Sequence, residues 1–343
     1  MIAVVLDGHG GPEVLRLGDV ATPPPGPGQV RVRVEACALN HLDLWIRRGL
    51  PRHKLTFPHV LGADVAGKVD ALGPGVSGLA TGDAVVLNPG LSCGRCVECL
   101  AGRDNLCDGY QLLGEDCWGG YAEHVVVPVA NVVARPAGLS VEEAAAIPLT
   151  FLTAWQMLVE LARVRPGETV VVLAAGSGVG VASVQIAKLH GARVIATAST
   201  AAKLERARAL GADETFNYCE QDLVAETKRL TGGRGADIVV EHVGAETWPK
   251  SLRATRRGGR IVTCGATSGH DARTDLRHVF FRQLQIFGST MGSKSSLLTI
   301  LGHVAAGRLR PVLDRVFPLS AASDAHRHLE ARTGFGKVVL RTD

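Results

Sequence analysis

The sequence predicts an α/β protein in which an irregular antiparallel β domain is combined with a doubly wound parallel sheet. The first observation behind this fold class is a βαβ unit with a glycine-rich turn at residues 167–200. The second is a regular alternation of strand and helix patterns that continues to about residue 264. The third is a series of short β-type segments, interrupted by Gly and Pro, in the first 135 residues.

Length and composition limit the function. The 343 residues suffice for two domains with separate cores, and the formal net charge of +4 is spread along the chain without a Lys/Arg block. Residues 1–30 show no signal-peptide pattern, and no apolar run approaches the roughly 20 residues that span a bilayer. We therefore expect a cytoplasmic protein that acts on a small molecule, with neither a nucleic acid nor a membrane as its partner.

The amino-terminal part of the chain is predicted to consist of short strands joined by turns. Residues 2–6 are apolar and strand-like, whereas the proline-rich stretch 22–28 suits neither a helix nor a central strand. Residues 30–36 alternate apolar and polar side chains, which is typical of a half-buried strand. Further β-type segments are expected at 60–72, 83–88 and 121–133.

The pattern changes at Ser140, which is followed by the acidic residues that favour a helix start. Residues 141–163 have helical periodicity with an interruption at Pro148. From there strands and helices alternate, as expected for a parallel sheet with helices on both faces. The expected strands are 170–174, 193–198, 236–240 and 260–264, and the expected helices are 179–190, 201–210, 221–231 and 246–256.

The turn between the first of these strands and its helix is rich in small residues. Glycine lets the backbone approach a pyrophosphate closely, and the helix N-terminus offers N–H groups and a positive dipole. The spacing departs from G-x-G-x-x-G because glycine occupies every second position, so a tight structural turn is the alternative. Since both strands and the helix are in place, we favour a dinucleotide site formed by Gly176, Ser177, Gly178, Val179 and Gly180.

Four cysteines are clustered at positions 93, 96, 99 and 107. Cys93, Cys96, Cys99 and Cys107 supply four soft ligands, enough for a closed tetrahedral zinc site, which we expect to be structural because it leaves no position for a substrate. An iron–sulfur cluster is a poorer match, because the ferredoxin run needs three residues before its last Cys and a Pro after it. Two disulfides are the remaining alternative, and they are rare in cytosolic chains.

These motifs, in this order, resemble the medium-chain dehydrogenase/reductase superfamily, which includes zinc-type alcohol dehydrogenases and quinone reductases. The resemblance covers essentially the whole chain. It rests on Gly62 and Gly67 in a β segment, on the cysteine cluster, on the glycine turn and on the closing segment Gly336-Lys337-Val338-Val339-Leu340.

The resemblance implies a domain arrangement. A GroES-like catalytic domain would comprise residues 1–150 and 289–343, with the structural zinc lobe at 88–115. A Rossmann cofactor domain would comprise residues 151–288. In this family the active site lies at the carboxyl ends of the parallel strands. The resemblance also implies a homodimer or homotetramer formed through an exposed sheet edge.

The catalytic zinc of the alcohol dehydrogenases has no matching ligands in this chain. The corresponding positions are Asn40, Ala63-Asp64 and approximately Leu149, so Cys and His are missing from all three. Residues 40–45 and 61–67 instead resemble the quinone reductases. A substitute metal site built from Cys37, His41, His59 or Asp64 is an alternative, although we expect Cys37 to be a core residue and His59 a hydrogen-bonded loop residue.

A site without a Lewis acid suits acceptors that delocalise charge themselves, such as quinones and α,β-unsaturated carbonyl compounds. The segment that faces the nicotinamide in the family supplies the candidate catalytic residues. Asn40 would orient the substrate or cofactor, and His41 would donate a proton. Trp45 would stack or pack. The predicted catalytic set is Asn40, His41, Asp43 and Trp45.

The second strand of the βαβ unit ends in Ala198, where NAD-specific enzymes have an acidic residue that binds the ribose hydroxyl. Ser199, Thr200 and Lys203 could bind a 2′-phosphate there, so we favour NADP(H), with NAD(H) as the alternative. Lys203 as an ordinary solvated residue is the simpler interpretation. By resemblance, Tyr218 and Arg332 contact the phosphate, and Thr153, Val243, Gly265, Ala266 and Ser289 line the nicotinamide half of the site.

The sequence thus predicts an NAD(P)H-dependent oxidoreductase that transfers hydride to a quinone or α,β-unsaturated carbonyl compound without a catalytic zinc. One alternative is a zinc-containing alcohol dehydrogenase that uses NAD(P). A second, from another class, is a dinucleotide-binding structural or regulatory protein without catalysis.

Overall fold

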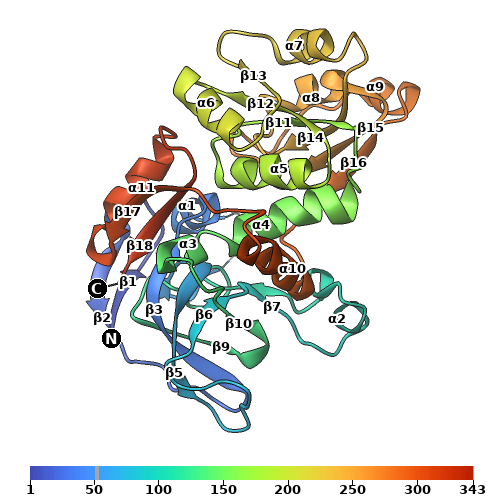
Figure 1. Ribbon diagram of the computed structural model, residues 1–343. Helices are drawn as coiled ribbons and strands as arrows, with labels where there is room; N and C mark the ends of the chain where they lie inside the picture. The colour runs from blue at the N-terminus through green and yellow to red at the C-terminus, as the bar shows by residue number, and fades with distance from the viewer. Residues whose placement is uncertain (51–53, 343) are drawn as a thin grey trace. The chain divides into compact units, whose positions relative to one another are not determined.

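The computed structural model describes residues 1–50 and 54–342, which form two compact units (Figure 1). The first unit contains Met1–Leu149 and Gly292–Asp343, and the second contains Thr150–Met291. These bounds differ by one to three residues from the domain limits expected from the sequence. Within the described residues, no helix is long and apolar enough to cross a bilayer.

The first unit is built around a seven-stranded sheet. Its pairs are antiparallel apart from β17 with β18, and the alternating burial along β3 places Val30, Val32 and Val34 in the core. The predicted irregular β domain is therefore present. The strand order is β10 (Val132–Ala134), β6 (Ala84–Leu87), β5 (Asp64–Leu72), β3 (Gln29–Ala38), β18 (Lys337–Arg341) and β17 (Leu313–Pro318), and β9 (His124–Pro128) also pairs with β3.

Smaller elements complete this unit. A three-stranded sheet contains β2 (Arg16–Asp19), β1 (Ile2–Leu6) and β4 (His59–Val60), and a two-stranded sheet contains β7 (Gly90–Leu91) and β8 (Gln111–Leu112). The helices are α1 (His41–Arg48), α2 (Val97–Leu100), α3 (Val141–Ala145), α10 (Lys294–Ala305) and α11 (Ala322–Glu330), with short 3-10 helices at Pro12–Val14, Asp104–Leu106, Val129–Asn131 and Leu319–Ala321. Helix α4 (Pro148–Trp155) begins here and continues into the second unit, where a π-helix follows at Gln156–Leu161.

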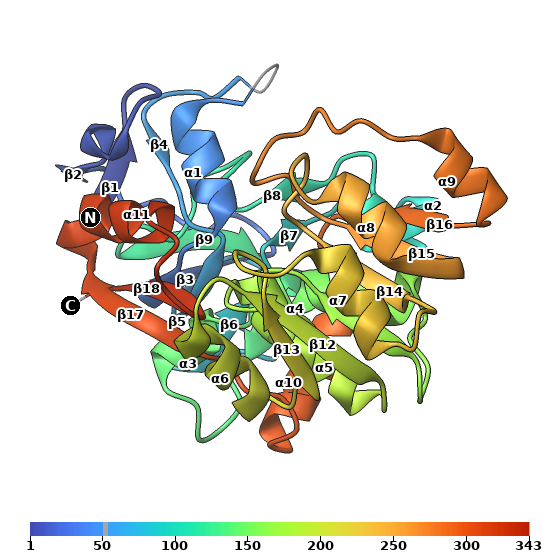
Figure 2. The same ribbon diagram turned by 90° about the horizontal axis from the view of Figure 1, so that it is seen from above.

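The second unit contains a six-stranded sheet in which every pair is parallel. The strand order is that of a doubly wound dinucleotide-binding sheet, with the first strand, β11, in the middle. In Figure 2 the labelled strands of this sheet follow that order, with β13 and β12 on one side and β14, β15 and β16 on the other. The order is β13 (Glu214–Asn217), β12 (Arg193–Ala198), β11 (Thr169–Val172), β14 (Ala236–Glu241), β15 (Thr255–Thr263) and β16 (Gln285–Gly288).

Helices cover both faces of this sheet. In Figure 1, α5 (Gly178–Leu189) lies below the sheet, and α7 (Leu223–Leu230) and α8 (Trp248–Ala254) lie above it. The remaining helices are α6 (Ala201–Ala209) and α9 (Leu276–Phe281). The central strands β11 and β14 are buried along their whole length, which is why they read as continuous apolar runs in the sequence. The sequence did not predict β13, α9 and β16.

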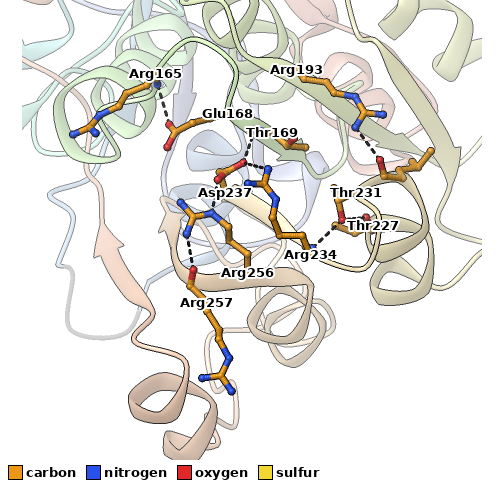
Figure 3. Close-up of polar contacts among 12 residues, drawn as sticks. Arg165, Glu168, Thr169, Arg193, Thr227, Thr231, Arg234, Asp237, Arg256 and Arg257 are labelled. Atoms are coloured by element: carbon orange, nitrogen blue, oxygen red, sulfur yellow. Dashed lines mark hydrogen bonds and ion pairs between the residues drawn. The ribbon is translucent and has the colours of Figure 1, made fainter.

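The amino ends of the central strands are held together by Asp237, which is 3% exposed (Figure 3). Its carboxylate accepts hydrogen bonds from the backbone N–H of Thr169 at 2.8 Å and from the guanidinium groups of Arg234 and Arg256. Burial alone would raise the pKa of Asp237, but these donors outweigh it and hold the pKa below its ordinary value. These polar groups thus hold the amino ends of the central strands together.

Candidate functional site

The glycine turn lies where β11 meets α5. Ser177 is the N-cap residue of α5, and its Oγ accepts a hydrogen bond from the N–H of Gly180 at 3.0 Å. A Cβ at Gly180 would lie 2.6 Å from the carbonyl oxygen of Ala174 and 2.7 Å from Cα of Ala175, so only glycine fits there. The predicted turn residues therefore form a close strand-to-helix junction at the N-terminus of a 12-residue helix, which is a suitable place for a pyrophosphate.

The other cofactor residues predicted in the second unit, apart from Thr153, follow the carboxyl ends of the parallel strands. The N–H of Tyr218 donates to the carbonyl of Ala198 at 3.2 Å, which joins the ends of β12 and β13. Thr153 is buried in α4, and Arg332 belongs to the first unit. The residues at this edge are Ser199 and Thr200 after β12, Tyr218 after β13, Val243 after β14, Gly265 and Ala266 after β15, and Ser289 after β16.

The end of β12 lacks a carboxylate. Ala198 is buried, and Thr200 is the N-cap of α6, where its Oγ1 accepts the N–H of Lys203 at 3.3 Å. The hydroxyl oxygen of Thr200 is thus the acceptor that caps the helix, and its O–H can still act as a donor. Its assignment as a phosphate ligand, like that of Lys203, stays a prediction.

Two residues at the end of β14 were missed by the sequence analysis. Glu241 is fully buried, and its carboxylate accepts hydrogen bonds from the N–H groups of Val243 and Gly244 at 2.8 and 3.0 Å. The hydroxyls of Thr247 and Ser251 also donate to it, at 2.9 and 2.6 Å. Glu241 therefore fixes the loop that carries the predicted Val243. His242, which directly follows Glu241, contacts Ser177. The signal that could have found both is a pair of polar residues directly after a buried apolar strand.

The predicted catalytic residues lie at the start of α1. Asn40 is the N-cap position, and Asp43 accepts the N–H of Asn40 at 2.7 Å and the N–H of Gly62 at 3.1 Å. Burial raises the pKa of Asp43 to about 7, although these N–H groups and the Lys337 ammonium act in the opposite direction. Asp43 therefore organises the backbone around Asn40.

His41 and Trp45 are half-buried on the same helix, with their ring centroids 6.5 Å apart. Trp45 comes four positions after His41, so both lie on one side of α1. Their roles as proton donor and stacking residue stay predictions.

A buried cluster surrounds Asp64 at the start of β5. The Lys337 ammonium donates to the Leu39 carbonyl at 2.7 Å, to Asn40 Oδ1 at 2.6 Å and to Asp64 Oδ2 at 3.0 Å. Asn40 Nδ2 donates to Asp64 Oδ2 at 2.9 Å, and the N–H of Leu149 donates to Asp64 Oδ1 at 2.7 Å. Asp64 is fully buried and Lys337 is 5% exposed. Lys337 was missed as a site residue; the available signal was a lone Lys before the apolar run 338–340.

This cluster does not fit a catalytic zinc. Such a site needs about three protein ligands and one open position. Asn40, Ala63 and Leu149 provide no Cys or His, and the one carboxylate, Asp64, is already paired with an ammonium ion. Of the substitute ligands considered above, Cys37 is a buried core residue, and His59 Nε2 lies 3.1 Å from the Gly114 carbonyl.

The cysteine cluster does fit a zinc ion. The four sulfur atoms lie within 4.8 Å of one another, and in the described part of the chain no other group of three or more His, Cys, Asp or Glu has comparable geometry. Sulfurs around a tetrahedral zinc are about 3.8 Å apart, given Zn–S bonds of about 2.3 Å. The backbone N–H groups of Arg95 and Cys96 lower the pKa of the Cys93 thiol to about 6, whereas the neighbouring thiols raise the pKa of Cys96 to about 11. All four cysteines are free thiols rather than disulfides.

Two family models match the chain. The alcohol dehydrogenase GroES-like domain matches residues 26–137, and the zinc-binding dehydrogenase domain matches residues 178–306. The NAD-dependent alcohol dehydrogenase of Sulfolobus acidocaldarius is 33% identical over 351 residues, which covers 99% of both chains. The human quinone oxidoreductase is 30% identical over 348 residues, which covers 99% of this chain and 97% of the human protein.

Solved structures of alcohol dehydrogenases are also similar to this chain. The crystal structure of an NAD-dependent alcohol dehydrogenase is similar over 100% of both chains, with 60% sequence identity and a TM-score of 0.97. The thermostable alcohol dehydrogenase of Pyrobaculum aerophilum, solved with cobalt and zinc bound, has 36% identity and a TM-score of 0.91 over 99% of both chains.

The cysteine geometry predicts one zinc ion per chain. Cys96→Ser should release this zinc and destabilise the lobe, because a structural zinc contributes directly to folding. The exposed Cys219, outside the cluster, provides the matched control Cys219→Ser, which should keep the metal. Elemental analysis of the purified proteins checks both. Two zinc ions per chain in the parent protein, or zinc retained in full by Cys96→Ser, would contradict the assignment.

Proposed function

The chain belongs to the medium-chain dehydrogenase/reductase superfamily and is an oxidoreductase, and from this premise we propose that it transfers hydride from a nicotinamide dinucleotide to a quinone or an α,β-unsaturated carbonyl compound without a catalytic zinc. The relatives named above include both alcohol dehydrogenases and quinone oxidoreductases, so membership alone leaves the substrate open. The choice between an alcohol and a quinone as the substrate depends on the cluster around Asp64.

The observation that carries the proposal is the ammonium group of Lys337. Its Nζ lies 2.6 Å from Asn40 Oδ1 and 3.0 Å from Asp64 Oδ2, two of the positions that correspond to the metal site of alcohol dehydrogenases. A zinc ion there would have to displace a buried cation from its carboxylate. Without a Lewis acid an ordinary alcohol is not readily ionised, whereas a quinone or an enone spreads the incoming charge over its own π system.

The chain's own residues would then bind and orient. The bound dinucleotide supplies the hydride chemistry. The turn from Ser177 to Gly180 and the N-terminus of α5 would hold its pyrophosphate, and the loop fixed by Glu241 would support the nicotinamide half. The side-chain amide of Asn40 forms hydrogen bonds with both Lys337 and Asp64. We therefore propose that Asn40 shapes the site and that His41 donates the proton.

A zinc-containing alcohol dehydrogenase is the second candidate, favoured by the names of several relatives. It would require zinc bound by Asp64 after Lys337 has moved away. The third possibility considered from the sequence, a binding protein without catalysis, is set aside because the chain is an oxidoreductase.

The cofactor preference is a separate proposal. Two of the similar proteins named above are described as NAD-dependent alcohol dehydrogenases, and they give no support to the predicted preference for NADP(H). The prediction rests on the missing carboxylate at Ala198 and on the position of Lys203 in the first turn of α6. NAD(H) is the alternative.

Self-association also stays a prediction. Strand β16 is an edge strand of the six-stranded sheet, and apolar side chains of the neighbouring α9 are exposed, namely Leu276, Phe280 and Phe281. An unpaired edge beside an apolar surface favours pairing with a second copy of the chain, as a homodimer or within a homotetramer.

The proposed reaction predicts reduction of a simple quinone or enone with reduced nicotinamide cofactor, at a rate that a chelator does not lower while the structural zinc is retained. The rate of cofactor oxidation at 340 nm measures it. Gly180→Ala is the control, because the added Cβ collides with the turn and should abolish cofactor binding. Vigorous, chelator-sensitive oxidation of a primary alcohol together with no quinone reduction would establish the zinc alternative instead.

The cofactor proposal predicts that NADPH binds more tightly than NADH. Lys203→Ala should weaken NADPH binding about tenfold, the value of one charge-assisted contact, and leave NADH unchanged. Lys228→Ala removes an exposed Lys from α7 of the same unit and serves as the control. Titration calorimetry measures the affinity of the parent and of each variant for both cofactors. Equal or tighter binding of NADH by the parent protein would overturn the NADP(H) preference and agree with the names of the relatives.

A further inference from the structure

His242 is a buried residue with one hydrogen bond and one unused nitrogen. It directly follows β14 and is 7% exposed. Its Nε2 lies 3.0 Å from the Oγ of Ser177. Its Nδ1 is buried and has no hydrogen-bond partner among the described residues. A buried polar atom that stays unpaired is costly, so a native protein retains one mainly where something else can satisfy it.

The position of His242 is that of a ligand-binding residue. Strands β11 and β14 are neighbours, with Val172 opposite Val240, so their carboxyl ends lie side by side. The glycine turn follows one strand and His242 follows the other. In open parallel sheets ligands bind at this edge.

Ser177 lies beside Nε2 of His242. Its Oγ accepts the N–H of Gly180, and its hydroxyl hydrogen can in turn be donated to Nε2. Burial lowers the pKa of His242 to about 4, partly opposed by the Ala174 carbonyl, so the ring is neutral near pH 7. If the Ser177 hydroxyl donates to Nε2, the proton of this neutral ring is on the buried Nδ1.

We propose that His242 contacts the dinucleotide directly, with Nδ1–H donating a hydrogen bond to a pyrophosphate or ribose oxygen while Nε2 holds the hydroxyl of Ser177. This inference rests on the proposed dinucleotide site and adds a residue to it. The imidazole acts as a neutral donor, so it contributes orientation without a charge.

The test uses the geometry of two amide side chains. In His242→Asn the amide nitrogen takes the place of Nδ1, whereas in His242→Gln the amide takes the place of Nε2. His242→Ala and His242→Gln should therefore weaken ADP-ribose binding about three- to tenfold, and His242→Asn should stay within about twofold of the parent. His190→Ala, at the far end of α5, is the control and should not change the affinity. Titration calorimetry on the full chain measures each dissociation constant.

Shorter probes identify the oxygen. AMP, which lacks both the pyrophosphate and the second ribose, should bind all variants equally. ADP should be affected like ADP-ribose if the acceptor is on the pyrophosphate, and unaffected if it is on the second ribose. An unchanged affinity of His242→Ala for ADP-ribose would overturn the inference. Rescue by Gln and not by Asn would overturn it too, since His242 would then act only through Ser177. Failure of the parent chain to bind any of these ligands would instead refute the proposed function.

A spectroscopic measurement covers the case of unstable variants. In the parent protein labelled with ¹⁵N-histidine, the ring nitrogens of a neutral His242 should show the proton on Nδ1. The addition of ADP-ribose should change the NMR chemical shift of that proton. A proton found on Nε2 would contradict the assignment without any substitution.

Discussion

The ion pair between Lys337 and Asp64 is the constraint on which the first unit and its site depend. Both groups are nearly excluded from water, where an unpaired charge would be prohibitively costly. The pair is therefore stable only with all its additional hydrogen bonds. These come from Asn40 at the end of β3 and from Leu149 in the first turn of α4. Three segments distant in sequence meet at one carboxylate, which fixes the start of β18 against β3 and β5.

The Lys337–Asp64 ion pair also distinguishes two clusters of the first unit by their ability to bind a metal ion. The cysteine lobe has four thiols whose sulfur atoms lie within 4.8 Å of one another, so it can accept zinc. The lobe is held in place by the Lys294–Asp104 ion pair, at 3.1 Å, at the start of α10. The Asp64 cluster has the reverse composition, because its cation is a side chain of the protein. A cysteine cluster suited to a structural metal and a cluster whose positive charge comes from Lys337 thus lie in one unit, and this supports the proposed use of substrates that stabilise their own charge.

The features predicted correctly from the sequence are those determined by local patterns. The glycine turn, the cysteine spacing and the strongly apolar strands β11 and β14 each lie within a short window. The missed elements β13 and β16 have only four residues each, too few for a periodic signal. The missed site contacts join distant positions: Lys337 and Asp64 are 273 residues apart, and His242 and Ser177 are 65 apart. The sequence identified Asn40 as a site residue, but its hydrogen bond with Lys337 could not be predicted without the fold.

A double-mutant cycle tests most directly whether Lys337 and Asp64 act as one unit. The free energy of unfolding is measured for the parent, Lys337→Met, Asp64→Asn and the double variant. Each single change should cost about 3–5 kcal/mol, because it leaves one buried charge or donor uncompensated. The double variant should cost clearly less than the sum, since neither charge then remains. Simple additivity would mean that the ammonium and the carboxylate do not depend on each other, and the structural reason for excluding a metal from Asp64 would be lost.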